Sequence, residues 1–543
     1  MRDRLRGAAV LLLFAALTVL MTWPQARHLD SRVYDADDPL LSIWRISWIA
    51  HALPSQPLDL LNGNIFYPEK RTLGYSDAVL LQGLAGAPLL WLGVSKVAVY
   101  NVLLLASIAL SGWAMWKYGL HLTGNGAAAI VGGIVFAFVP YRFDHLHHLE
   151  LQATFCLPLT LLYVDRAVAH RSSRDAWLAM ASFVGQVYSC VYYSVFLATA
   201  LVPIVAWKVW RLAPEARRAF LRVMAAPVMA AAAITLPYLM VYAINRETLG
   251  ERPNSEVRLY SATLWNYLAA PESNIIHGSR SGRFGAPERL LFPGAVALVL
   301  AGIGLVARGR RAMVVITVGM VGLVISLGLN TVFYEPLQST IVVYRGLRAP
   351  ARASILVFLA VAALAAFGWE RLVRHQSRRV ALIVSIVGAA MLVCEYRNRL
   401  EAFLTLPDRP AEVYQWLAMQ PRSVVVEVPF ARPDRLHAIA DGLYMFNSTW
   451  HWQPLLNGYS GFFPRSFQEL AERMTTFPDD QSIEYLKRRG AQLIVVHGAL
   501  MTPEEFGDMT ATLLARRDLQ ALARFEERMG SDVVFRLLPQ SHR

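Results

Sequence analysis

Apolar residues are concentrated in long runs that are separated by short polar and basic stretches. Most of these runs have the length that an α-helix needs to cross a bilayer, roughly 17–25 residues. The apolar stretch 78–94 is short and is interrupted by Gln82, Gly83, Gly86 and Pro88. If it spanned the bilayer, every later basic cluster would lie outside, so we expect it to lie on the outer surface of the membrane. We predict about eleven spans, near residues 8–23, 97–117, 126–141, 150–166, 176–192, 193–210, 218–243, 289–307, 311–330, 351–371 and 379–395.

Basic residues between the runs indicate how the chain crosses the membrane. Cytoplasmic loops are rich in Lys and Arg, and four clusters fit this rule on one side: Arg166/Arg171/Arg174, Lys208/Arg211/Arg217/Arg218, Arg308/Arg310/Arg311 and Arg371/Arg374/Arg378/Arg379. The N-terminus is then cytoplasmic, and the first external loop (24–96) and the C-terminal region lie outside. The net charge of +13 is therefore explained by topology, and we expect no nucleic-acid partner. The first run lacks a small-residue cleavage site and is expected to be retained as a span.

The composition changes near residue 400. Two apolar runs, 423–430 and 491–498, and a weaker one at 532–538, are typical of strands, and helical patterns occur at 411–419, 482–489 and 503–514. We predict a mainly α fold: a polytopic transmembrane bundle (1–399) followed by a soluble extracytoplasmic α/β domain (400–543).

Three acids in the first external loop are the leading candidates for catalysis. Asp35, Asp37 and Asp38 precede an aromatic helix with Trp44 and Trp48 on one face. In the plainer interpretation this is a solvated turn in which Asp38 caps the helix and Pro39 is its first residue. Three acids exceed what a cap requires, so a carboxylate here is a candidate general base or ligand of a divalent cation such as Mg²⁺ or Mn²⁺.

Three further segments carry polar side chains on the same predicted side. Ionisable groups at membrane depth usually face a cavity, which favours a substrate pocket over a histidine metal site at 140–152. Guanidinium groups in 344–354 suit a lipid phosphate, although they also fit an interfacial anchor. The aromatic segment 447–464 suits stacking on sugars, although it also fits a loop packed by its own rings. The candidate substrate-binding residues are Arg142, His145, His148, Glu150, Gln152, Arg345, Arg348, Arg352, His451, Trp452, Asn457 and Tyr459.

The chain has no P-loop and no glycine-rich dinucleotide motif, and its three cysteines have no metal-binding spacing. The predicted cytoplasmic loops are too short to bind a nucleotide-sugar donor. The substrate is therefore expected to lie already in the membrane.

Five segments together resemble the GT-C class of polytopic glycosyltransferases and, more closely, a group of bacterial membrane proteins described as glycosyltransferases. These segments are YDADDPLLSIWRISWIAHAL, NIFYPEKRTLGYSDAVLLQGL, FAFVPYRFDHLHHLELQ, GLRAPARAS and HWQPLLNGYSGFFP. The resemblance implies transfer of a hexosyl or pentosyl group, with inversion, from a polyprenyl-phosphate donor to a glycan, lipid or protein acceptor outside the bacterial inner membrane. It places the catalytic acid at Asp38, with Asp35 or Asp37 as a second.

Two other functions are compatible with these features. A transporter or flippase of lipid-linked saccharides would need polar residues that continue through the bilayer, whereas here they stay on one side. A non-catalytic protein of envelope glycan assembly would not need the acids at 35–38.

Overall fold

The computed structural model describes residues 2–286, 288–306, 310–401, 403–430, 435–527 and 530–539. Arg308, one of the predicted cytoplasmic arginines, lies outside the described residues. The chain forms two compact units. The first comprises residues 1–28, 101–243 and 251–402, and the second comprises 29–100, 244–250 and 403–543.

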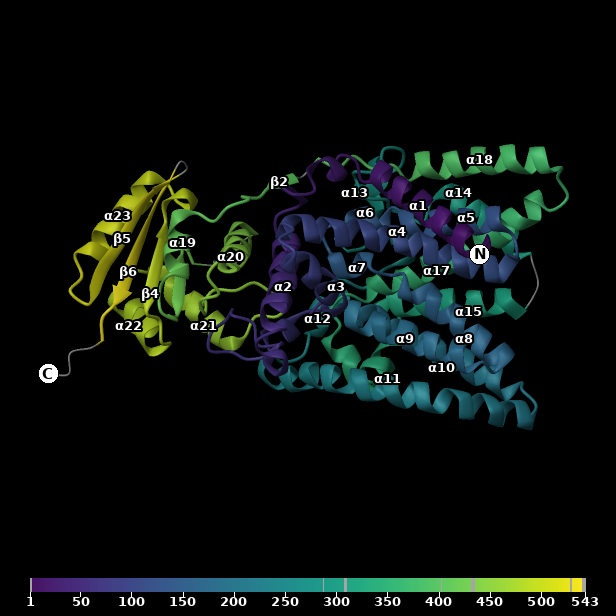
Figure 1. Cartoon of the computed structure of the whole chain (residues 1–543), viewed down its shortest axis with the longest axis horizontal. Coiled ribbons are helices and arrows are strands. Elements are labelled where there is room, and N and C mark those ends of the chain that lie inside the picture. The colour runs from purple at the N-terminus through teal and green to yellow at the C-terminus, as the bar shows by residue number, and fades with distance from the viewer. Residues whose placement is uncertain are drawn as a thin grey trace. The chain divides into compact units, whose positions relative to one another are not determined.

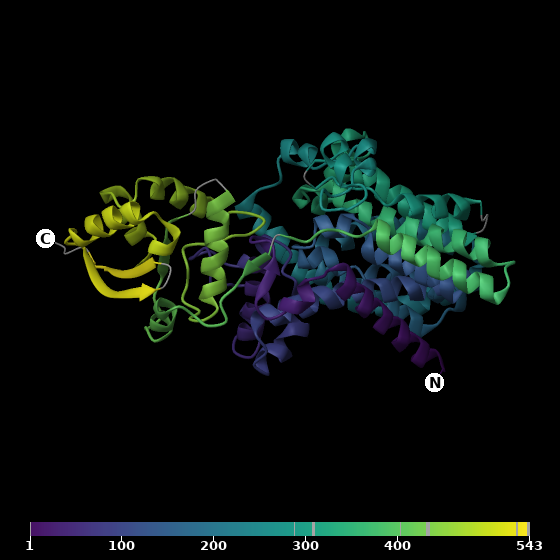
Figure 2. The ribbon, with the colours of Figure 1, turned by 90° about the horizontal axis from the view of Figure 1, so that it is seen from above.

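The first unit is a bundle of helices that run side by side (Figures 1 and 2). Every predicted span contains a helix. The helices of these spans are α1 (Arg2–Met21), α4 (Lys96–Thr123), α5 (Gly126–Phe138), α8 (Cys156–His170), α9 (Ser173–Ser189), α10 (Val191–Trp210), α11 (Pro214–Leu249), α14 (Ala295–Leu305), α15 (Arg310–Ser326), α17 (Ser354–Val373) and α18 (Arg378–Glu395). The first residues of α4 and the last of α11 belong to the second unit. Short helices α12 (Asn254–Leu259), α13 (Ser281–Phe284) and α16 (Tyr334–Thr340) connect them.

Five helical segments of the described chain are long and apolar enough to cross a membrane: Lys96–Thr123, Gly126–Asp144, Val191–Trp210, Pro214–Leu249 and Pro350–Val373. Shorter apolar helices lie at Leu5–Met21, Leu80–Trp91, Ala295–Leu305 and Arg311–Ser326. The protein is therefore a membrane protein. The larger number of about eleven spans stays a prediction.

Helices α14 and α17 pack closely because glycine removes the side chain at their contact. A Cβ on Gly368 would lie 1.9 Å from the carbonyl oxygen of Leu300, and one on Gly304 would lie 2.0 Å from that of Leu364. Small residues at such contacts let the two backbones approach, which is how many membrane helices associate.

The second unit joins part of the first external loop to the C-terminal region. Strand β1 (Arg32–Tyr34) pairs antiparallel with β2 (Phe403–Thr405), and the rings of Tyr34 and Phe403 lie 5.7 Å apart. The loop also provides α2 (Asp38–Ala52), which packs on α3 (Leu80–Trp91) and on α20 (Arg435–Ser448). Residues 29–100, which the sequence analysis assigned to the transmembrane domain, are thus part of the same compact unit as residues 403–543.

The C-terminal region contains a mixed sheet with strand order β3-β4-β6-β5. Strand β3 (Val425–Val428) runs parallel to β4 (Leu493–His497), whereas β6 (Gly530–Leu537) runs antiparallel to β4 and to β5 (Leu519–Glu527). Strands at the three predicted positions are thus confirmed. The helices that accompany the sheet are α19 (Glu412–Ala418), α20, α21 (Arg465–Arg473), α22 (Asp480–Arg488) and α23 (Pro503–Leu514).

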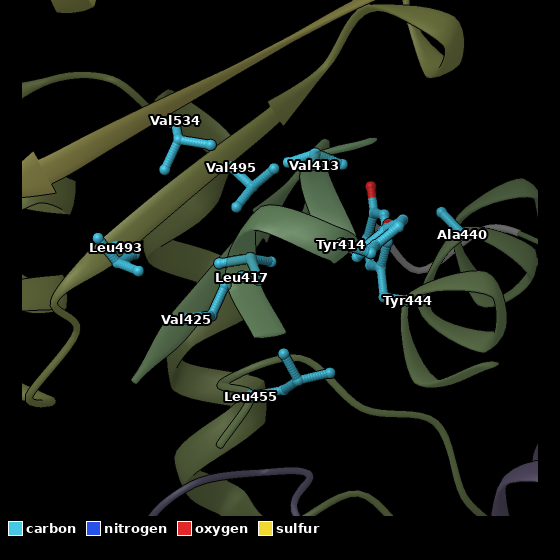
Figure 3. Packing of buried hydrophobic residues seen from close by; sticks show 10 residues of the cluster. All are labelled: Val413, Tyr414, Leu417, Val425, Ala440, Tyr444, Leu455, Leu493, Val495 and Val534. Atoms are coloured by element: carbon cyan, nitrogen blue, oxygen red, sulfur yellow. The ribbon is translucent and has the colours of Figure 1, made fainter. Parts of the chain in front are cut away.

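Alternation along the strands separates the two faces of this sheet. Leu493 and Val495 of β4, together with Val534 of β6, join a buried cluster with α19 and α20, which Figure 3 shows from close by. Their neighbours Ile494 and Val496 point to the other face and are also fully buried. Because both faces of β4 are covered, its first four residues (493–496) form a continuous apolar run.

Candidate functional site

The histidine segment of the first unit is a break between two helices. After α5 the chain forms the single turns α6 (Tyr141–Asp144) and α7 (Leu149–Gln152), and α8 follows. Arg142 stabilises the chain at this interruption through three hydrogen bonds. Its Nε donates to the Phe136 carbonyl (2.8 Å), one terminal nitrogen donates to the Gln152 carbonyl (3.1 Å), and the other terminal nitrogen donates to the Thr154 hydroxyl. The Gln152 amide donates in turn to the carbonyls of Arg142 (2.9 Å) and His145 (2.7 Å). Both side chains are buried, and these bonds fix the loop that presents the histidines.

Three buried side chains and one half-buried side chain meet beside this loop: His145, His148 and Arg352 are buried, and Glu288 is half-buried. Arg352 Nε lies 2.9 Å from Glu288 Oε2, and a terminal nitrogen of Arg352 lies 2.5 Å from Glu288 Oε1 and 3.5 Å from His148 Nε2. His145 Nε2 is 3.7 Å from Glu288 Oε2. Three separate segments thus supply an acid, two imidazoles and a guanidinium to one place.

Electrostatics fix the charges of this group. Burial alone would raise the pKa of Glu288, but the charge and hydrogen bonds of Arg352 hold it well below its usual range. Burial lowers the pKa of His145 well below its ordinary value, so this imidazole is neutral at pH 7. Glu288 also has a φ of 65°, a conformation that is costly for a residue with a side chain and that is found most often at functional sites.

The same residues include a possible set of metal ligands. One ligand atom each from His145, His148 and Glu288 lie within 4.8 Å of one another. Among the described residues, His145 Nε2 has no hydrogen-bond partner, which leaves its lone pair or proton available. Two imidazoles and one carboxylate suit Mn²⁺ or Zn²⁺ better than Mg²⁺, which prefers oxygen ligands. Glu288 already binds Arg352 through both oxygens, so only its remaining lone pairs would serve a metal.

The predicted arginines differ in their partners. Arg345 donates to the carbonyls of Gln338 and Ser339 (both 3.0 Å) and therefore stabilises its own loop. Arg348 is half-buried; its backbone nitrogen donates to the Tyr192 hydroxyl (2.9 Å), and its guanidinium lies 5.9 Å from the centre of the Tyr260 ring. Within the described residues, no hydrogen bond or ion pair joins that guanidinium to another residue. Arg348 is thus the member of the set that is best able to take an external anion.

The acids of the second unit stand at the start of α2. The helix begins at Asp38, so Pro39 is its second residue and Asp37 is the N-cap. The plainer interpretation of the sequence, with Asp38 as the cap, was therefore wrong by one residue. The Asp37 side chain makes no capping hydrogen bond. Asp35 has a φ of 73°, and its carboxylate accepts from the Ala36 nitrogen (2.6 Å). All three acids are half-buried. Capping therefore does not explain why this segment carries three carboxylates.

Two predicted residues of the aromatic segment lie beside α2. The Tyr459 hydroxyl donates to Asp38 Oδ1 over 3.4 Å. The Trp452 ring stacks on His51 of α2, with centroids 4.3 Å apart, and meets Trp48 edge-on at 5.7 Å. The half-buried Trp452 also has a φ of 52°. The structure thus brings Asp38, Tyr459 and this aromatic stack together within one unit.

The other predicted residues have partners within the protein. Asn457 is fully buried and exchanges hydrogen bonds with the backbone of Glu427 (2.7 and 3.0 Å). His451 accepts from the Gln453 nitrogen (3.0 Å), and burial, with a smaller effect of Lys96, lowers its pKa to about 3. Glu150 is buried in α7. Their direct contact with a substrate stays a prediction.

The C-terminal sheet holds a buried titratable cluster that the sequence did not indicate. His497 bonds to Glu427 Oε2 through Nε2 (2.9 Å) and to Asp532 Oδ1 through Nδ1 (3.0 Å), and the Tyr414 hydroxyl donates to Glu427 Oε2 (2.8 Å). Glu427, His497 and Asp532 come from strands β3, β4 and β6, and Tyr414 comes from α19, so the cluster links three strands of the sheet to this helix. Sequence reasoning also missed Glu288, which stands in no motif, and His51, which lies within the quoted segment 34–53 but was not singled out; each acquires its partners only in the folded chain.

A family model described as "Domain of unknown function (DUF6311)" matches residues 48–389. No curated protein matched the sequence.

Similar solved structures include ArnT from Cupriavidus metallidurans in the apo state, at 13% identity and a TM-score of 0.49, covering 98% of each chain. They also include the oligosaccharyltransferase of Archaeoglobus fulgidus in the apo form, at 12% identity and a TM-score of 0.46, covering 93% of this chain and 71% of that one. The complex of this oligosaccharyltransferase with Zn and sulfate matches at 13% identity and a TM-score of 0.44, covering 98% of this chain and 74% of that one. These proteins are GT-C membrane glycosyltransferases, the class that the sequence motifs resemble. At such identities and TM-scores, the similarity assigns neither donor nor acceptor to this chain.

Proposed function

The chain belongs to the DUF6311 family, and we propose that it is a membrane glycosyltransferase that moves a sugar from a polyprenyl-phosphate donor to an acceptor hydroxyl on the extracytoplasmic face. The observation that carries the proposal is the group Asp35, Asp37 and Asp38, three half-buried carboxylates at the start of α2 that are not accounted for by helix capping. The sequence resemblance to glycosyltransferases covers the same segment. The multi-pass location in a bacterial inner membrane, with the N-terminus in the cytoplasm, is part of the proposal.

In the proposed reaction the acceptor oxygen attacks the anomeric carbon of the donor sugar. The bond from this carbon to the acceptor oxygen forms as the bond to the lipid phosphate breaks, and the configuration inverts. Asp38 takes the proton of the acceptor hydroxyl, and polyprenyl phosphate leaves with the electron pair of the broken bond. A positioned carboxylate is a suitable base for this step. The hydrogen bond from the Tyr459 hydroxyl to Asp38 Oδ1 helps to orient this carboxylate.

Positive charge is needed where the leaving phosphate develops its charge. We assign this role first to Arg348, whose guanidinium is not committed to another residue among those described. Arg352 is held by Glu288 and lies next to His148, so it contributes a fixed positive charge and orients the imidazole. Arg142 and Gln152 stabilise the histidine-containing segment 140–152 by hydrogen bonds, and Arg345 stabilises the loop that carries the arginines of 344–354.

Divalent-cation dependence is a further part of the proposal. His145, His148 and Glu288 are the residues that would hold such an ion. A bound cation would supply additional positive charge for a phosphate group.

The experiment that tests the proposal follows the fate of a lipid-linked sugar. Full-length protein in membrane vesicles is given polyprenyl-phosphate sugars labelled in the sugar and in the lipid, and both labels are followed. The proposal predicts free polyprenyl phosphate in amounts equal to the sugar transferred, and none above background for a variant with Asp35, Asp37 and Asp38 all changed to Asn. Movement of the intact donor between leaflets without cleavage would instead show a transporter and would contradict the proposal.

A further inference from the structure

A pocket of about 710 Å³ opens between α1, α4 and α8, at the ends of these helices where basic residues gather. It lies wholly within the first unit. Its lining comes from residues 6–11 of α1, residues 113–121 of α4, and Leu162 and Arg166 of α8. None of these is among the residues assigned to glycosyl transfer above.

The walls of the pocket are apolar and are held in place. Trp113 Nε1 donates to the Gly7 carbonyl over 3.1 Å, which fixes the indole against α1. Leu11 is half-buried and Leu120 is exposed, so an apolar face is available beside the ring. The small residues Gly7 and Ala8 keep this side of the pocket open, because neither fills the space in front of the tryptophan.

The rim of the pocket is cationic. Lys117 Nζ stands 4.7 Å from the centre of the Trp113 ring, and the Arg6 side chain is exposed. Arg166 donates from Nε to Asp175 at 3.1 Å, yet its side chain remains 44% exposed. His121 is bonded to Asp165 at 2.6 Å, and neither Asp175 nor Asp165 lines the pocket. All lining residues are described, and no carboxylate is among them.

An apolar slot with a cationic rim at the end of membrane helices is complementary to one class of molecule. An acidic phospholipid places acyl chains along the helices and a phosphate at the membrane surface. Basic pockets between membrane helices on the cytoplasmic side bind such headgroups, and each nearby Lys or Arg adds to the attraction. The orientation proposed above puts this rim in the cytoplasmic leaflet.

We propose that this pocket binds an acidic phospholipid of the cytoplasmic leaflet, of the phosphatidylglycerol class. Arg6, Lys117 and Arg166 contact the phosphate, and an acyl chain lies along Leu11, Leu120 and Trp113. The inference rests on the proposed orientation but not on the proposed chemistry. It can therefore fail while glycosyl transfer is confirmed, and the reverse also holds.

The test is a titration of the full-length protein in detergent with phosphatidylglycerol, read out by native mass spectrometry. The double variant Arg6→Gln/Lys117→Gln removes two rim charges and leaves Arg166 with its partner Asp175. Its matched control, Arg378→Gln/Arg379→Gln, removes two exposed charges from the start of α18, outside the pocket. We expect the pocket variant to bind roughly tenfold or more weakly and the control to stay within about twofold.

A second variant keeps the basic residues of the rim and fills the apolar part of the pocket. Ala8→Phe places a ring in the pocket, and we expect a loss of binding similar to that of the charge variant. Phosphatidylcholine is expected to compete poorly, and inorganic phosphate at millimolar concentration is expected not to displace the lipid. Equal binding by the wild type and both pocket variants, equal competition by phosphatidylcholine, or displacement by free phosphate would each overturn the proposal.

Discussion

Glu288 and Arg352 form a two-pronged ion pair, with nitrogen–oxygen distances of 2.9 and 2.5 Å, at the end of the helix bundle. The pair joins the segment before α14 to the turn that precedes α17. Arg352 is only 4% exposed, so solvent can compensate little of its charge. Removing one member of such a pair leaves an uncompensated buried charge, which is far costlier than losing a surface pair.

Glu288→Gln is therefore expected to lower the free energy of unfolding by about 3 kcal/mol or more. The measurement is thermal unfolding of the full chain in detergent, together with denaturant titration. The control is Glu469→Gln, which breaks the exposed pair Arg465–Glu469 and is expected to cost less than about 1 kcal/mol. Equal effects of the two changes would show that the buried pair is not important for stability.

Gly368 determines how closely α14 and α17 pack. Gly368→Ala is expected to destabilise the bundle by about 1–3 kcal/mol, because the new methyl group meets the Leu300 carbonyl oxygen at 1.9 Å. Gly302→Ala in α14 is a matched control, since a Cβ there has nothing within 4 Å. Its effect is expected to be neutral or slightly stabilising, because Ala favours helix over Gly. The unfolding midpoints of the two variants check the prediction, and a harmless Gly368→Ala would contradict it.

His497 makes the stability of the C-terminal sheet depend on pH. Burial alone would lower the pKa of His497, but hydrogen bonds to Asp532 and Glu427 outweigh this effect and raise the pKa from 6.5 to about 9. A group whose pKa is raised in the folded state stabilises that state fully at pH values below its unfolded-state pKa. This stabilisation is lost as the pH rises through the folded-state pKa. We therefore expect roughly 3 kcal/mol to be lost between pH 6.5 and about pH 9.5.

Unfolding at a series of pH values measures this loss, and His497→Gln is expected to remove most of the slope over the same interval. A wild-type slope that persists in the variant would assign the pH dependence to another group.

Arg348 is expected to act on the donor. Arg348→Gln removes a charge-assisted contact to the lipid phosphate, so the KM for the donor is expected to rise about tenfold or more, with a smaller effect on the KM for the acceptor. Arg345→Gln is the comparison, because Arg345 bonds to carbonyls of its own loop. Steady-state kinetics with each substrate varied in turn make the distinction. A change confined to the acceptor would remove the assigned role.

Part of this structure could be predicted from the sequence because local patterns determine it. The apolar runs 423–430 and 491–498 predicted two strands, and every residue of the observed strands β3 and β4 is buried. Strand Leu519–Glu527 was missed because its charged, half-exposed sequence is also typical of a helix.

Side-chain partners were harder to foresee. Sequence identified the segment of Arg142 and His148 as unusual, but no local pattern shows that Arg142 bonds to the Phe136 carbonyl or that Glu288, far along the chain, approaches His145. The same is true of Asn457, whose side-chain amide forms two hydrogen bonds with the backbone of Glu427. Such partners depend on tertiary structure, which a single sequence does not display.

The most direct test of the account is the turnover of Asp38→Asn compared with Asp30→Asn, an exposed acid of the same loop. Full-length proteins in membrane vesicles receive the same polyprenyl-phosphate sugar, and release of polyprenyl phosphate is timed. If Asp38 is the general base, the variant is expected to be roughly 10²–10⁴ times slower, while Asp30→Asn keeps wild-type turnover. Undiminished turnover in Asp38→Asn would contradict the proposed mechanism.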